Sequence, residues 1–126
     1  MRITVVTPTY NEAENLPKLV SALFSLPLDL RVLVVDDNSP DGTGRVADQL
    51  TTAYPGRVDV LHRPGKLGLR SAYLNGFQKV LEGDAQAIVQ MDADFSHDPS
   101  ALVEMSGLLK SNDVVLGSRY VKGGSV

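Results

Sequence analysis

Short runs of apolar, β-branched residues alternate along the chain with longer segments whose apolar residues recur at helical spacing. The short runs predict five β-strands, at Ile3–Thr7, Arg31–Asp36, Val58–His62, Ala87–Met91 and Val114–Ser118. Four helices are predicted between the strands. Their apolar positions are Leu16, Leu19, Val20 and Leu23; Val46, Leu50 and Ala53; Ala72, Tyr73, Gly76, Phe77 and Val80; and Leu102, Met105 and Leu109.

The regular alternation of strand and helix predicts the fold class. Such a chain forms parallel strands joined by right-handed crossovers, which gives an open, doubly wound, mostly parallel α/β sheet in a three-layer α/β/α arrangement. The nearly continuous apolar strands fit a sheet that is covered on both faces. In sheets of this kind, ligands bind outside the carboxyl ends of the strands. We therefore look for function in the residues that directly follow each strand.

Polar residues suited to helix N-termini precede three of the predicted helices. They are Asn11 with Glu14 at capping-box spacing, Asp41, and Asp98 followed by Pro99. Pro17 leaves the start of the first helix open between Glu12 and Asn15, since proline is tolerated only in the first turn.

Composition narrows the class of protein further. The chain has 126 residues, a net charge of -3 and no cysteine, which excludes disulfides and thiolate metal sites. Its acidic balance argues against nucleic acid as a partner, because phosphate binding needs clustered basic residues. The sequence shows neither a signal peptide nor an apolar run near the roughly 20 residues that span a bilayer. We expect one domain that is soluble or at most peripheral to a membrane.

Two acids directly follow the fourth predicted strand. Asp92 and Asp94 can turn toward one cation, and such hard oxygen ligands suit Mg²⁺ or Mn²⁺, with substrate phosphate oxygens as further ligands. The alternative is that both are loop acids, with Asp94 or Asp98 capping the next helix. Their position after a buried strand favours the metal site.

A second acidic pair, Asp36 and Asp37, follows the second predicted strand. An acid at this place in dinucleotide-binding folds accepts hydrogen bonds from ribose hydroxyls. The alternative is that Asp36, Asn38 and Asp41 are turn formers that bond to their own backbone. Ligand contact is favoured for Asp37, and the turn role is favoured for Asp41.

Neither of the glycine-rich phosphate loops, GxGxxG or GxxxxGK[ST], occurs where it would be needed. The charge of a bound diphosphate would instead be met by a metal ion together with Lys66 and Arg119. Tyr10 suits stacking on a base or sugar as well as anchoring its own loop. Arg63 and Arg70 are expected to be solvated loop charges, and His62 is expected to make a local hydrogen bond.

Five segments at the ends of the predicted strands carry a further signal: Pro8–Glu12, Val35–Thr43, Lys66–Leu69, Met91–His97 and Gly117–Tyr120. Together they resemble family 2 glycosyltransferases of the GT-A fold, and within that family the dolichyl- and polyprenyl-phosphate mannose synthases. The segments come in family order and cover nearly the whole chain. Arg70 is a departure, because the family usually has a glycine there.

The resemblance implies roles for individual residues. Nucleotide contacts would come from Pro8, Tyr10, Glu12, Val35 and Asp37. The sugar diphosphate would meet Asp92, Ala93 and Asp94, with Asp92 and Asp94 on a Mg²⁺ or Mn²⁺ ion. Asp94 and Arg119 would be the catalytic residues, Arg119 contacting a donor or acceptor phosphate.

The function implied by the resemblance is transfer of mannose from GDP-mannose to a polyprenyl phosphate, with inversion and at the cytoplasmic face of a membrane. Residues 1–126 would then be the nucleotide-sugar-binding part of a catalytic domain whose acceptor half lies beyond Arg119. Three alternatives stay open: a family 2 transferase with another donor such as UDP-glucose, a non-catalytic nucleotide-sugar-binding fragment, and a phospho-receiver signalling module with acids at other strands.

Overall fold

Where the structure describes the chain, the fold is a five-stranded parallel sheet flanked by four helices. The computed structural model describes residues 2–65, 68–94, 98–108 and 114–116. Its elements are β1 (Arg2–Thr9), α1 (Asn15–Phe24), β2 (Asp29–Asp36), α2 (Thr43–Ala53), β3 (Val58–His62), α3 (Leu69–Leu81), β4 (Ala87–Gln90), α4 (Ala101–Leu108) and β5 (Val114–Leu116). The predicted fold class is therefore confirmed, and every predicted strand is present in whole or in part.

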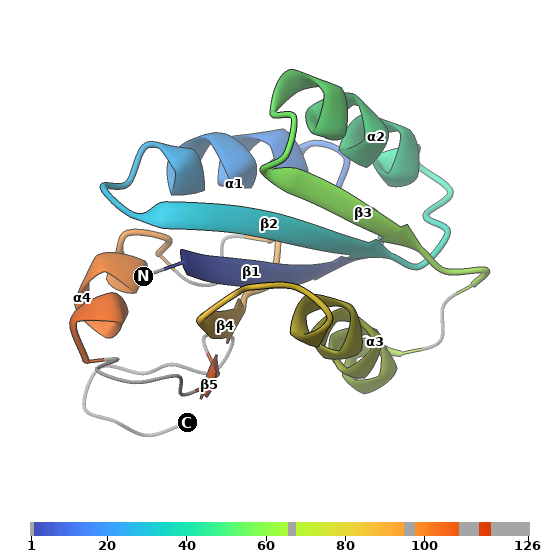
Figure 1. Ribbon diagram of the computed structural model, residues 1–126. Coiled ribbons are helices and arrows are strands. Elements are labelled where there is room, and N and C mark those ends of the chain that lie inside the picture. The colour runs from blue at the N-terminus through green and yellow to red at the C-terminus, as the bar shows by residue number, and fades with distance from the viewer. Residues whose placement is uncertain (1, 66–67, 95–97, 109–113, 117–126) are drawn as a thin grey trace.

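The strand order is β3-β2-β1-β4-β5, and all four neighbouring pairs are parallel. The chain reverses its direction of winding between β1 and β4, so this is the point where parallel sheets of this kind bind ligands. α1 and α2 lie on one side of the sheet and α3 lies on the other (Figure 1). The loops that follow β1 and β4 therefore emerge side by side at the carboxyl edge.

Each face of the sheet has its own apolar core. The larger core joins α1 and α2 to one face and includes Leu102 of α4. The smaller core packs Ala72, Tyr73 and Phe77 of α3 against the other face. These α3 residues were predicted as apolar positions, and strands with buried side chains on both faces explain the nearly continuous apolar runs.

β1 is longer than predicted and continues through Pro8 to Thr9. Met91 donates its N–H to the carbonyl of Val6, so the backbone polar groups of Val6 face β4. Those of Pro8, two residues further along β1, point to the same side, because a strand alternates with a period of two. β4 ends at Gln90, which pairs with Val6. Pro8 therefore lies beyond the last β4 partner, and its missing N–H costs no ladder hydrogen bond.

The start of α1 falls within the range that the sequence left open, but the predicted capping box is absent. α1 begins at Asn15, and no side chain caps it. Asn11 adopts a left-handed conformation (φ 59°) and donates its N–H to Ser39, so no capping box forms. Pro17 falls at the third helical position, inside the first turn, where proline is tolerated. α4 begins at Ala101, two residues later than Pro99, but Asp98 accepts the N–H of Ser100 at 3.0 Å and so caps the turn that leads into the helix.

α3 approaches the sheet more closely than any residue but glycine would allow at one position. A Cβ on Gly76 would lie 2.5 Å from Cγ1 of Val6 and 3.2 Å from Cγ2 of Val35. A real Cβ never comes that near to another carbon, so the absence of a side chain sets the distance between α3 and β1. The helix is thereby held against the strands that carry the carboxyl-edge loops.

We expect Gly76→Ala to lower the free energy of unfolding by about 1–2 kcal/mol. Overpacking costs about 1–3 kcal/mol and outweighs the roughly 0.5–1 kcal/mol that alanine gains in a helix. Urea denaturation measures the change. Gly83→Ala is the matched control, because its Cβ would make only an ordinary contact with Val80 at 3.5 Å. Equal stability of the two variants would contradict the close approach.

Candidate functional site

The first feature of the carboxyl edge is a buried carboxylate that ties two loops together. Asp36 is 2% exposed and accepts hydrogen bonds from the hydroxyls of Thr9 (2.8 Å) and Ser39 (2.6 Å). The Ser39 N–H also donates to Asp36 at 3.1 Å. Asp36 thus acts as the turn former that the sequence allowed, joining the end of β1 to the loop after β2.

The loop after β2 also holds the loop that carries Tyr10 and Glu12. The Glu12 N–H donates to the Thr43 hydroxyl at 2.9 Å, and the Ala13 N–H donates to Asp41 at 3.2 Å. Asp41 in turn accepts the N–H and the hydroxyl hydrogen of Thr43. The turn role expected for Asp41 is confirmed, and the acceptors of one loop position the backbone of the other.

A buried ion pair between Arg63 and Asp37 lies next to these contacts between the two loops. Nε of Arg63, which directly follows β3, is 2.9 Å from Oδ1 of Asp37, and both side chains are over 90% buried. Nη1 of Arg63 donates to Asn75 of α3 at 3.2 Å. The expectation that Arg63 is a solvated charge is wrong, because the parallel sheet brings the end of β3 beside the end of β2. The sequence feature that could have predicted this role is the position of Arg63 directly after a strand.

The geometry of this ion pair leaves buried polar atoms without hydrogen bonds, which lowers its contribution to the stability of the fold. The Nε and Oδ1 atoms are in contact but make no aligned hydrogen bond, and Nη2 of Arg63 has no hydrogen-bond partner among the described residues. A buried pair repays its desolvation only when further hydrogen bonds satisfy both groups. The site therefore keeps a buried, incompletely satisfied cation next to Asp37, which a polar ligand at this edge could complete.

The acids after β4 form the second half of the edge. Asp92 is half-buried, and its Oδ1 accepts a hydrogen bond from the Tyr73 hydroxyl at 2.8 Å. Asp94 is exposed. Among the residues described, no group of three or more His, Cys, Asp or Glu side chains gathers as a complete metal site. The pair fits an ion such as Mg²⁺, which is commonly held by one or two carboxylates with water and substrate phosphates.

The remaining predicted contacts divide into exposed and buried residues. Tyr10 is 37% exposed at the edge. Val35 and Ala93 are buried, at 0% and 2% exposure, and present almost no surface of their own. Their roles, and those of Pro8, Glu12 and the acids, stay predictions. Lys66 and Arg119 lie outside the described residues.

His62 forms the local hydrogen bond expected of it. Its Nε2 lies 2.8 Å from Oδ1 of Asp48 on α2, on the exposed surface. It also lies beside Gly44, where a Cβ would meet the imidazole at 3.4 Å. Nothing in this arrangement points to catalysis.

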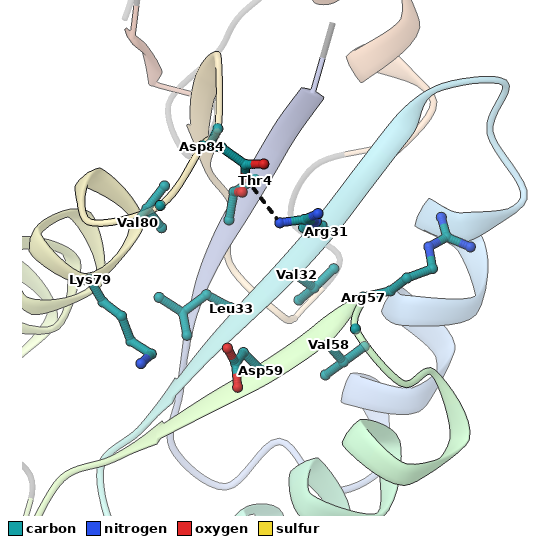
Figure 2. Close-up of a pocket in the computed structure, with 13 residues that line it drawn as sticks. Thr4, Arg31, Val32, Leu33, Arg57, Val58, Asp59, Lys79, Val80 and Asp84 are labelled. Atoms are coloured by element: carbon teal, nitrogen blue, oxygen red, sulfur yellow. Dashed lines mark hydrogen bonds and ion pairs between the residues drawn. The ribbon is translucent and has the colours of Figure 1, made fainter.

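A cavity of about 240 Å³ lies away from the predicted ligand residues. It is lined by the amino-terminal halves of β2 and β3 and by the end of α3, as Figure 2 shows. Two of the cations around it have partners: Arg31 pairs with Asp84 at 3.2 Å, and Arg57 lies over the Phe24 ring at 3.9 Å. Because none of the acids at the carboxyl edge lines it, the cavity is separate from the acidic edge.

An open parallel sheet with carboxylates at its carboxyl edge is typical of proteins that bind phosphorylated ligands there. Comparison with known proteins makes the class definite. Residues 4–126 match the family described as "Glycosyl transferase family 2", and the chain belongs to this family. The phospho-receiver alternative is thereby wrong.

Within the described residues, none of the helices has the length and hydrophobicity to cross a membrane.

Individual relatives refine the comparison. Polyprenol monophosphomannose synthase of Mycolicibacterium smegmatis is 48% identical over 99% of this chain and 48% of its own length. Undecaprenyl-phosphate mannosyltransferase of Micrococcus luteus is 45% identical over 100% of this chain and 51% of its own. This chain therefore spans about half the length of these curated relatives.

A solved structure agrees with the fold. It is a mannosyltransferase from Pyrobaculum calidifontis in complex with GDP-mannose and Mn²⁺, with a TM-score of 0.65 and 26% identity. The alignment covers 74% of this chain and 27% of that one. The GT-A architecture expected from the sequence is confirmed by this likeness.

We expect Arg63→Met to destabilise the protein by about 3–5 kcal/mol, because it leaves the Asp37 carboxylate buried without its cation. Adding Asp37→Leu should recover much of the loss, since an apolar pair carries no desolvation cost. Urea denaturation of the single and double variants measures both effects. A double variant no more stable than Arg63→Met alone would show that the ion pair does not cause the loss.

Asp41 predicts a dependence of stability on pH. The Thr43 hydroxyl, with the N–H groups of Thr43 and Ala13, holds the pKa of Asp41 below its ordinary value of 3.8. A lowered pKa in the folded state adds stability above that value, and the added stability is lost as the pH falls through the folded pKa. We expect the Tm gap between wild type and Asp41→Asn to be widest above pH 3.8 and to close in stronger acid. A gap that does not vary with pH would contradict this assignment.

Proposed function

We propose that this chain is the donor-binding part of a polyprenyl-phosphate mannosyltransferase, which transfers mannose from GDP-mannose to a lipid phosphate. The observation that carries the proposal is the placement of Asp92 and Asp94 directly after β4, at the reversal point of a family 2 sheet. The names of the relatives support a lipid phosphate as acceptor and mannose as the sugar. A structural neighbour that holds GDP-mannose with Mn²⁺ supports the donor and the metal.

In this proposal the two halves of the edge bind different parts of the donor. The nucleotide lies toward the ends of β1 and β2, where Tyr10 is exposed and Asp37 lies beside the incompletely satisfied Arg63. The diphosphate lies toward β4, where Asp92 and Asp94 would hold Mg²⁺ or Mn²⁺. Pro8, Glu12, Val35, Ala93 and Lys66 complete the proposed substrate contacts.

The proposed reaction is a single displacement at the anomeric carbon. The bond from that carbon to the β-phosphate oxygen breaks, the bond to the acceptor phosphate oxygen forms, and the configuration of the sugar inverts. A bound divalent cation would stabilise the negative charge of the departing GDP. Asp92 and Asp94 hold that charge-neutralising group in place, and Arg119 is the proposed further phosphate contact.

The acceptor needs little activation. The second pKa of a phosphate monoester is near 6, so the nucleophilic oxygen is already ionised at neutral pH and no strong general base is required. The lipid tail of such an acceptor stays in a bilayer. We therefore propose that the intact enzyme works at the cytoplasmic face of a membrane.

The metal requirement provides the test. Calorimetry should show that GDP-mannose binds in the presence of Mn²⁺ or Mg²⁺ and loses its affinity in EDTA. Asp94→Asn should weaken the metal-dependent part by more than about 100-fold, because even the loss of an outer partner of a metal ligand costs roughly 10–100-fold. Asp59→Asn is the matched control, since Asp59 is an exposed strand acid that lines the remote cavity.

Equal affinity of GDP-mannose in EDTA and in Mn²⁺ would overturn the metal assignment. A parallel titration with UDP-glucose tests the donor: tighter binding of UDP-glucose would favour the alternative family 2 transferase with another donor sugar.

A further inference from the structure

The hydrogen bond between Tyr73 and Asp92 links a helix to the acidic edge. Tyr73 lies in the first half of α3 and is 7% exposed, yet its hydroxyl reaches Oδ1 of Asp92 at 2.8 Å. The rest of the ring is packed in the apolar core with Val6, Leu33 and Ile88. A phenylalanine would fill that core equally well, so packing alone does not account for the hydroxyl.

The hydroxyl is held in place by the packing of α3. Gly76, one turn after Tyr73, lets the helix pack against Val6 at a distance that no Cβ would permit, and a Cβ there would also crowd Val35 at 3.2 Å. The ring of Phe77 also lies 6.2 Å from the Tyr73 ring, between centroids. A buried aromatic side chain on a closely packed helix has little freedom, and its hydroxyl is a rigid donor.

Asp92 needs such a donor because the strand no longer orients it. β4 ends at Gln90, and Met91 makes the last backbone hydrogen bond to β1, through the carbonyl of Val6. Asp92 follows directly, half-buried at the point where the ladder stops. Without another contact, its side chain would be free to rotate between several rotamers.

The chemistry of the donor suits a metal ligand. A neutral hydroxyl fixes one carboxylate oxygen and leaves the full negative charge on the group. An Arg or Lys in its place would neutralise the carboxylate and repel a divalent cation. Partners of this kind orient metal ligands and are worth about 10–100-fold in metal affinity or activity.

We propose that Tyr73 is a positioning residue for the metal site: its hydroxyl holds Asp92 in the orientation in which this carboxylate binds the divalent cation. The inference rests on the proposed function, since it concerns the metal ligand assigned there. It assigns a role at this site to a residue on α3.

The test compares two variants that each remove one hydroxyl. Mn²⁺ binding in the presence of GDP is measured by electron paramagnetic resonance, and Tyr73→Phe should weaken it by about 10–100-fold. The matched control is Tyr54→Phe, because Tyr54 packs edge-on against Phe24 in the core on the α1 and α2 side. The Tm of each variant without metal shows that it is folded. At saturating Mn²⁺ the affinity of Tyr73→Phe for GDP-mannose should return to that of wild type, which a general loss of structure would not allow.

A double-mutant cycle sharpens the result. In an Asp92→Asn background, Tyr73→Phe should have no further effect on Mn²⁺ affinity, because the group that it positions is gone. Unchanged Mn²⁺ affinity in Tyr73→Phe, or equal losses in both backgrounds, would overturn the inference and leave the proposed function standing. A wild-type protein that binds no Mn²⁺ with GDP would instead overturn the proposed function.

Discussion

The parallel pairing of β1 with β4 is the constraint on which the rest of the structure depends. Met91 donates its N–H to Val6, and the two strands end within a few residues of each other. Because the winding of the chain reverses at this pair, the two loops that follow lead away in opposite directions, which is the arrangement in which such sheets bind ligands. Tyr10 and the half-buried Asp92 therefore come from distant parts of the sequence to one edge of the sheet.

The same edge holds several carboxylates, and two of them, Asp36 and Asp37, are buried. Each acid is accommodated differently: Asp36 by hydroxyls and a backbone N–H, Asp37 by the cation of Arg63, and Asp92 by the neutral hydroxyl of Tyr73. The first arrangement satisfies its carboxylate and is structural. Beside Asp37, the Arg63 cation keeps an N–H group without a hydrogen bond, and Asp92 keeps its negative charge beside the neutral Tyr73 hydroxyl. Both properties are expected where a ligand and a cation complete the site.

The candidate site was predictable where it depends on position along the chain. Asp37, Asp92 and Asp94 follow strands, and the carboxyl ends of parallel strands must meet at one edge. The roles of Arg63 and Tyr73 were not predictable, because the sequence indicates a solvated charge for the first and a core residue for the second. A basic residue after a strand and a tyrosine on an apolar helix face have many ordinary roles, and only the distance to a partner distinguishes among them.

The sequence by itself determined the fold class, the number of strands, the acidic edge and the family, because hydrophobic period and motif order are properties of the chain. It also predicted which loops carry the candidate site residues. Only the tertiary structure decided where α1 begins, which cation is buried beside Asp37 and which hydroxyl reaches Asp92. These depend on contacts between residues far apart in the chain, and their geometry is set by the packing of α3 and of neighbouring strands rather than by local propensity.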